Sequence, residues 1–169
     1  TVVAEAAGVP IMVQDAPLSG VDLSIDLLVR MAMEISGVSY FKIETPQTAD
    51  KLRALIAAGG DAIAGPFDGE ESITLIADLN AGATGTMPSA LLPDLIRPVL
   101  THHAAGNSTA AETQYANILP LINFENRQCG LRACKAVMME GGVITTDHVR
   151  HPLPPLPTET RTQLLDLAR

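Results

Sequence analysis

Apolar residues follow two rhythms along the first half of the chain. Short apolar runs bounded by glycine or proline are typical of buried strands, whereas apolar residues three or four positions apart predict helices. The runs predict strands over 9–16, 37–44, 61–65 and 82–87. Helical spacing between them predicts helices over 24–36, 45–58 and 68–81. This half of the chain is therefore expected to be a series of βα units.

Local signals mark several boundaries of these elements. Ser24 is expected to cap the helix that follows it, and Pro46 suits a first helical turn. The pair Gly59-Gly60 is expected to end that second helix. The opening residues look like the last turns of a helix, and the chain begins with Thr1 rather than methionine. We therefore expect further sequence to precede it.

After Pro88 the pattern becomes helical throughout. It predicts helices over 89–106, 108–125 and 127–140 and, beyond a proline-rich connector, near 158–169. Four βα units imply a parallel sheet with helical crossovers.

Two α/β architectures fit that series. One is a small doubly wound sheet. The other is the second half of a (β/α)8 TIM barrel, with four parallel strands, followed by C-terminal helices. A complete barrel runs to about 250 residues, and the helix-like opening favours the partial barrel. We expect 1–87 to form the half-barrel, and 88–169 the last barrel helix with a helical extension, as one structural unit.

Composition limits the classes of function. The chain has 169 residues, 47% of them hydrophobic, which is enough for a domain with its own core. The net charge of -8 and the 3% of aromatic residues exclude an extended nucleic-acid or anionic-membrane surface. The apolar runs are too short to span a bilayer. We expect a small-molecule partner and a homo-oligomer, either a dimer or a tetramer.

The two cysteines, Cys129 and Cys134, form no Cys-x-x-Cys pair. A disulfide framework or zinc site is not expected from this spacing, and a reducing compartment, the cytoplasm, fits best.

Lys42 is unusual in the middle of a run that otherwise predicts a buried strand. Side chains alternate between the two faces of a strand, so Lys42 and Glu44 share one face with Val38 and Tyr40. Phe41 and its neighbours Ser39 and Ile43 would pack against the outer helices. In a barrel, Lys42 and Glu44 would point inward at the C-terminal end of the strand, where barrel enzymes place their catalytic groups.

A lysine in that position has a clear chemical use. Its amine can form a Schiff base with a ketone, and Glu44 could stabilise the iminium or accept a proton from the substrate carbon. The alternative is an ordinary ion pair between Lys42 and Glu44 at the strand end, and spacing alone favours that alternative.

The order of four motifs is informative: VPIMVQDAPLSGVDLS, then SYFKIE, GGDAIAG and AGATGTM. It resembles the second half of the dihydrodipicolinate synthase / N-acetylneuraminate lyase family, over essentially the whole chain. Members of that family are class I Schiff-base aldolases and dehydratases, built on a (β/α)8 barrel with three added helices. The resemblance implies that Lys42 is the Schiff-base lysine. It also implies chemistry that needs no metal, nucleotide or other cofactor.

The chain departs from the family where lyases usually read YNVPGRTG. Here the stretch is QDAPLSG, so Gln14 takes the place of the tyrosine and no arginine follows Pro17. Glutamine is neither a general acid nor a base, but it can hydrogen-bond a hydroxyl or an ordered water.

The motifs QDAP, FKIETP and GPFDGEE most resemble the family's dehydratases of 2-keto-3-deoxy sugar acids of the L-arabonate type. That resemblance implies an imine at C2 through Lys42, loss of a C3 proton to Glu44 and loss of the C4 hydroxyl. The product in that branch is 2,5-dioxopentanoate.

Three further residues are candidates for substrate binding. Gly65, in a loop expected after the third strand, could let substrate approach the backbone. Asp68 could hydrogen-bond a substrate hydroxyl or cap the next helix, and Thr84 could contact substrate from the fourth strand. No His-Glu-x-x-His or similar spacing predicts a metal site. A pyruvate-dependent aldolase and a non-catalytic scaffold or regulatory chain remain the alternative functions.

Overall fold

A computed structural model of the chain describes residues 1–16, 18 and 20–169. The predicted turn at Pro17 and Ser19 lies outside the described residues. The chain divides into two compact units, Thr1–Met87 and Pro88–Arg169. That both belong to one structural unit stays a prediction.

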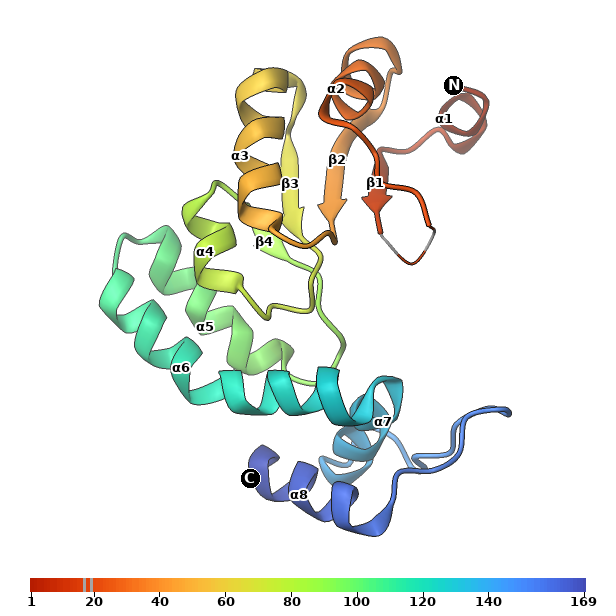
Figure 1. The fold of residues 1–169 in the computed structure, drawn as a ribbon, viewed down its shortest axis with the longest axis vertical. Helices are drawn as coiled ribbons and strands as arrows, with labels where there is room; N and C mark the ends of the chain where they lie inside the picture. The colour runs from red at the N-terminus through yellow and green to blue at the C-terminus, as the bar shows by residue number, and fades with distance from the viewer. Residues whose placement is uncertain (17, 19) are drawn as a thin grey trace. The chain divides into compact units, whose positions relative to one another are not determined.

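The first unit contains the predicted parallel sheet. Its elements are α1 (Val2–Ala7), β1 (Ile11–Asp15), α2 (Ile25–Glu34), β2 (Val38–Ile43), α3 (Thr48–Gly59), η2 (Gly60–Ala62), β3 (Gly65–Asp68), α4 (Leu75–Asn80) and β4 (Gly85–Thr86). The four strands are parallel and lie in the order β1-β2-β3-β4 (Figure 1). A doubly wound sheet would reverse its strand order at a switch point, so this sequential order is that of a barrel segment.

The two faces of the sheet differ as the alternation predicts. Phe41 and Ile43 are fully buried on the face covered by α2, α3 and α4. Tyr40 and Lys42 lie on the other face and are only half-buried. The core of this unit therefore lies between the sheet and its helices.

The third strand begins later than its sequence predicts. The prediction of a strand over 61–65 is wrong, because Gly60–Ala62 forms a 3-10 turn and the strand is Gly65–Asp68. Gly65 pairs with Tyr40 and Asp68 with Ile43. Glycine and proline disfavour strands, but pairing with β2 outweighs that preference. Residues 65–68, which were expected to lie in a loop after the third strand, therefore form the third strand.

Two helices start later than expected because residues before them adopt left-handed backbone conformations. Gln47 adopts the left-handed φ of 62°, so Pro46 lies in a turn and α3 begins at Thr48. Glu71 and Ser72 also have positive φ, and α4 begins only at Leu75. Left-handed residues cannot continue a right-handed helix.

Other local signals are confirmed. Ser24 caps α2 by accepting a hydrogen bond from the Leu27 N–H at 3.3 Å. The third helix ends at the glycine pair, and the opening residues are helical, as their pattern predicts.

The second unit is helical, as expected. It contains α5 (Pro93–Ala104), α6 (Ser108–Phe124), the π-helical turn η3 (Glu125–Cys129), α7 (Leu131–Glu140) and α8 (Thr158–Ala168). Helix α5 packs on α6 and α7 packs on α8. Within the described ranges, no helix combines the length and the apolar character that a membrane crossing requires.

Candidate active site

The carboxyl ends of β1 and β2 bring three polar side chains to one face of the sheet. Gln14 and Lys42 are register partners, so their side chains point to the same side. The Glu44 N–H donates to the Asp15 carbonyl at 2.9 Å, which extends the pairing beyond β2. Gln14, Lys42 and Glu44 therefore converge as the alternation predicts.

The three side chains of this cluster meet at one oxygen atom of Glu44. Glu44 Oε2 accepts a hydrogen bond from Gln14 Nε2 at 2.5 Å and lies 3.2 Å from Lys42 Nζ. The side chains of Lys42 and Glu44 are 16% and 20% exposed, so both are sheltered yet reachable. The ion pair favoured by spacing alone is present. It also holds an amine, a carboxylate and an amide within reach of one small ligand.

Gly69 closes one side of the cluster, and sequence analysis missed it. Its N–H donates to the Ile43 carbonyl at 2.8 Å. A Cβ at this position would lie 2.8 Å from Lys42 Cγ and 3.1 Å from Glu44 Cβ. The glycine therefore admits the lysine stem. Its place directly after a strand is a sequence signal, but only the strand register shows which side chain it contacts.

Aromatic rings lie below the cluster on the same face. Tyr40 precedes Lys42 by two residues, and Phe67 is the register partner of Lys42. Small neighbours make room for both rings: a Cβ at Gly65 would collide with Tyr40, and one at Gly85 would lie 3.1 Å from Phe67. Gly65 thus occupies the start of β3 beside a ring, rather than a loop above the strand.

Asp68 lies on the opposite face from Lys42. It is fully buried, and its carboxylate accepts hydrogen bonds from Thr86 Oγ1 at 2.6 Å and from the Glu70 N–H at 2.8 Å. Burial raises the pKa of Asp68, while these hydrogen bonds and the charge of Lys42 act in the opposite direction. The side chain is committed to joining β3, β4 and the loop that follows β3.

Thr84 is also separate from the cluster. It is exposed just before β4, and its N–H and hydroxyl both donate to the Pro66 carbonyl, at 2.8 and 3.2 Å. In the strand register it is Gly85, and not Thr84, that pairs with Phe67, the register partner of Lys42. The structure thus brings together Gln14, Lys42 and Glu44, and it separates Gly65, Asp68 and Thr84 from them.

An ion pair on the helix-covered face supports the end of β1. Asp15 is buried, and its Oδ2 lies 2.7 Å from Lys51 Nζ of α3. Its Oδ1 accepts a hydrogen bond from the Leu23 N–H at 3.2 Å. Because Asp15 follows Gln14 directly, these contacts help to fix the strand end that carries Gln14.

The described part of the chain holds no group of three or more His, Cys, Asp or Glu side chains arranged to bind a metal ion.

Comparisons with known proteins show which proteins the chain is similar to. The model of the dihydrodipicolinate synthetase family matches residues 1–169. The chain is 57% identical over 167 residues to L-2-keto-3-deoxyarabonate dehydratase of Azospirillum brasilense, covering 99% of this chain and 54% of that protein. The chain therefore spans about half the length of that relative.

Solved structures show the same similarity in fold. The dihydrodipicolinate synthase of Acinetobacter baumannii, determined with pyruvate, is 28% identical and has a TM-score of 0.86, over 98% of this chain and 56% of that chain. The synthase of Rhodopseudomonas palustris is 24% identical with a TM-score of 0.86, over 95% and 55% of the two chains. The partial barrel predicted from the sequence is confirmed.

Proposed function

The chain belongs to the dihydrodipicolinate synthetase family, and on that premise we propose that it serves a Schiff-base lyase that dehydrates a 2-keto-3-deoxy sugar acid. The observation that carries the proposal is the convergence of Lys42, Glu44 and Gln14 on one carboxylate oxygen. The similarity to L-2-keto-3-deoxyarabonate dehydratase supports the substrate class.

The first step forms a covalent bond to Lys42. A neutral amine attacks the C2 carbonyl of the substrate, and loss of the carbonyl oxygen as water leaves an imine. The ammonium must first give up a proton. Glu44 Oε2, 3.2 Å from Lys42 Nζ, is placed to accept it. The same proton passes to the C2 oxygen, which leaves as water, so Glu44 is again a carboxylate before the next step.

The second step is elimination. Glu44 takes a proton from C3; the C3–H electron pair forms a C2=C3 double bond and the C2=N pair moves onto nitrogen, which gives an enamine. The nitrogen pair then re-forms the C2=N bond as a C3=C4 double bond forms, and the C4 hydroxyl leaves as water with the proton that Glu44 took from C3. Hydrolysis of the imine then releases the product and restores Lys42. One water is lost overall and no carbon–carbon bond breaks.

Gln14 acts on Glu44 in this scheme. Its amide donates to the same oxygen that faces the lysine and cannot itself transfer a proton. It therefore orients the base, where a tyrosine would supply a proton relay. This difference supports dehydration over aldol cleavage.

Borohydride trapping tests the proposal, because the chain has only three lysines. The protein is incubated with 2-keto-3-deoxy-L-arabonate, reduced, and mapped by mass spectrometry. Lys135 donates to the His148 carbonyl at 2.6 Å. Burial lowers the pKa of Lys51, but hydrogen bonds to Asp15 and Asp22 outweigh it and raise that pKa. We expect the adduct on Lys42 alone.

Matched variants make the result decisive. Lys42→Arg should abolish the adduct, and Lys51→Arg should retain it. Water loss without carbon–carbon cleavage supports the dehydratase, whereas pyruvate release indicates an aldolase. If the intact protein gave no adduct on Lys42, both the dehydratase and the aldolase hypotheses would be wrong. The non-catalytic scaffold would then be the remaining hypothesis.

We also propose a cytoplasmic homo-oligomer. Cys129 is buried and Cys134 lies 3.4 Å from the Met138 sulfur, an arrangement compatible with reduced thiols. Exposed apolar side chains on the helical unit, including Leu131 and Val143, are compatible with contacts between copies. Light scattering coupled to size exclusion would give the number of subunits, and a monomer would contradict the oligomer.

A further inference from the structure

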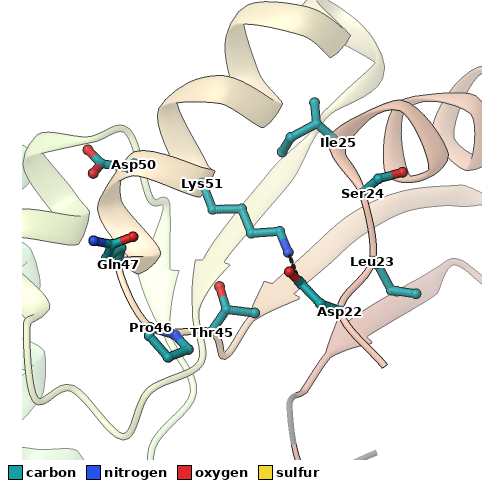
Figure 2. Close-up of a pocket in the computed structure, with 9 residues that line it drawn as sticks. All are labelled: Asp22, Leu23, Ser24, Ile25, Thr45, Pro46, Gln47, Asp50 and Lys51. Carbon is teal, nitrogen blue, oxygen red and sulfur yellow. Dashed lines mark hydrogen bonds and ion pairs between the residues drawn. The ribbon is translucent and has the colours of Figure 1, made fainter. Parts of the chain in front are cut away.

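A cavity lies near the carboxyl ends of β1 and β2, between the loop that enters α2 and the first turns of α3. Its volume is about 550 Å³. Lys51 crosses it, with Asp22 from one wall and Thr45 from the other (Figure 2). None of the cluster of Gln14, Lys42 and Glu44 lines it.

Lys51 has two carboxylate partners of different character. Asp15 is buried and lies 2.7 Å from Lys51 Nζ. Asp22 also bonds to Lys51 Nζ, but its side chain is 81% exposed. Exposed ion pairs contribute little because water and salt compete with them. Asp15 is therefore a fixed partner, whereas Asp22 is replaceable.

Thr45 supplies an unused donor. The residue is only 5% exposed, and its hydroxyl has no hydrogen-bond partner among the residues that the structure describes. Buried hydroxyl groups in proteins are nearly always hydrogen-bonded. Figure 2 shows this hydroxyl turned toward the Lys51 side chain. An acceptor bound in the cavity would satisfy it.

The first turn of α3 adds a favourable field for an anion. The helix has 12 residues, and its N-cap Gln47 makes no side-chain capping hydrogen bond. The amino end of a helix carries partial positive charge and exposes N–H groups. Gln47 lines the same cavity as Thr45 and Lys51. A cation, a hydroxyl and a helix amino end thus bound one space.

We propose that this cavity is a binding site for a small carboxylate. One oxygen of the ligand takes the place of Asp22 on Lys51, and the other accepts a hydrogen bond from Thr45. Asp22 itself demonstrates that Lys51 pairs with a carboxylate at this point. The site is separate from the Schiff-base cluster, because Thr45 lines the cavity and the preceding residue, Glu44, does not. The inference therefore goes beyond the proposed enzyme activity.

Binding of difluoroacetate tests the site, followed by ¹⁹F NMR at constant ionic strength. Neutral difluoroacetamide is the control probe. The expected result is saturable binding of the anion alone. Asp22→Asn removes the internal competitor and should tighten binding roughly fivefold or more, whereas Thr45→Val should weaken it by roughly fivefold, the factor for one hydrogen bond.

Asp50→Asn is the matched control for Asp22→Asn. It removes the same charge from the same cavity, but Asp50 bonds to Arg53 instead of Lys51. Its effect on affinity should be less than twofold. Lys42→Met should leave binding unchanged, which separates this site from the Schiff-base cluster. Lys51 itself is kept, because its loss would leave Asp15 buried without a cation.

Four results would overturn the proposal. The first is that neither the unaltered protein nor Asp22→Asn shows saturable binding, and the second is that Asp22→Asn and Asp50→Asn raise the affinity equally. The third is that a folded Thr45→Val protein binds with undiminished affinity. The fourth is that Lys42→Met loses binding. The second would show a general effect of charge, and the last would place the anion at the Schiff-base cluster.

Discussion

Replacing Gly69 by alanine adds one methyl group beside the lysine proposed to form the Schiff base. The new Cβ would lie 2.8 Å from Lys42 Cγ and 2.8 Å from the Ile43 carbonyl oxygen. The oxygen belongs to backbone that the Gly69 N–H itself holds at 2.8 Å, so it cannot retreat without breaking that bond. The lysine stem must therefore move.

The size of the effect follows from these distances. Carbon atoms pack at roughly 3.5–4.0 Å, so Lys42 Cγ must shift by about 0.7 Å or more. A misplacement of about 1 Å in a catalytic group can lower a rate by about 100-fold. We expect kcat to fall by about 10- to 100-fold. Overpacking costs about 1–3 kcal/mol, and the melting temperature should drop by only several degrees.

The assay measures kcat and the rate at which the imine on Lys42 forms, followed by borohydride trapping. A thermal melt checks folding. Gly141→Ala is the control, since its Cβ would meet the Val137 carbonyl at an ordinary 3.5 Å. Both rates should be unchanged in that variant. If a folded Gly69→Ala protein kept more than half of the original rate, the close approach of Gly69 would not constrain Lys42.

Three other predictions concern polar side chains of the first unit. Burial, chiefly, raises the pKa of Asp78 to about 6. The folded state therefore holds this proton up to about pH 6, and stability is lost as pH rises through that value. Asp78→Asn should match the unaltered protein in urea unfolding at pH 4 and exceed it by up to about 3 kcal/mol at pH 8; equal pH profiles would contradict this. Gln14→Leu removes the donor to Glu44 and should lower kcat about tenfold, while pyruvate trapping on Lys42 persists; loss of trapping would show a wider disturbance. Lys51→Met leaves Asp15 buried without its cation and should lower the free energy of unfolding by about 3–5 kcal/mol, whereas Lys51→Arg should retain most of it; equal losses would refute the ion-pair explanation.

Sequence periodicity was sufficient where a feature depends on one element. The alternation along β2 placed Lys42 and Glu44 together and buried Phe41 and Ile43 on the other face. The cap at Ser24 likewise needs only its own helix. These features follow from backbone geometry that neighbouring residues determine.

Features that depend on strand register could not be predicted in this way. Asp68 faces away from Lys42 because it pairs with Ile43, a relation that β3 alone does not encode. The role of Gly69 appears only when β3 lies beside β2. The contact between Lys51 and Asp15 joins α3 to β1. Each requires residues far apart in the sequence to be placed in space.

The packing of the Tyr40 ring against Gly65, which has no side chain, also limits which substitutions β2 and β3 can accept during evolution. Tyr40 occupies volume that a side chain at position 65 would need. Neither position can therefore enlarge by itself. A relative with a bulkier residue at position 65 should carry a smaller one at position 40, so the two sites are expected to covary. Paired substitutions at positions 40 and 65 could change the shape of this face of the sheet, because a larger side chain on one strand would be offset by a smaller one on the other.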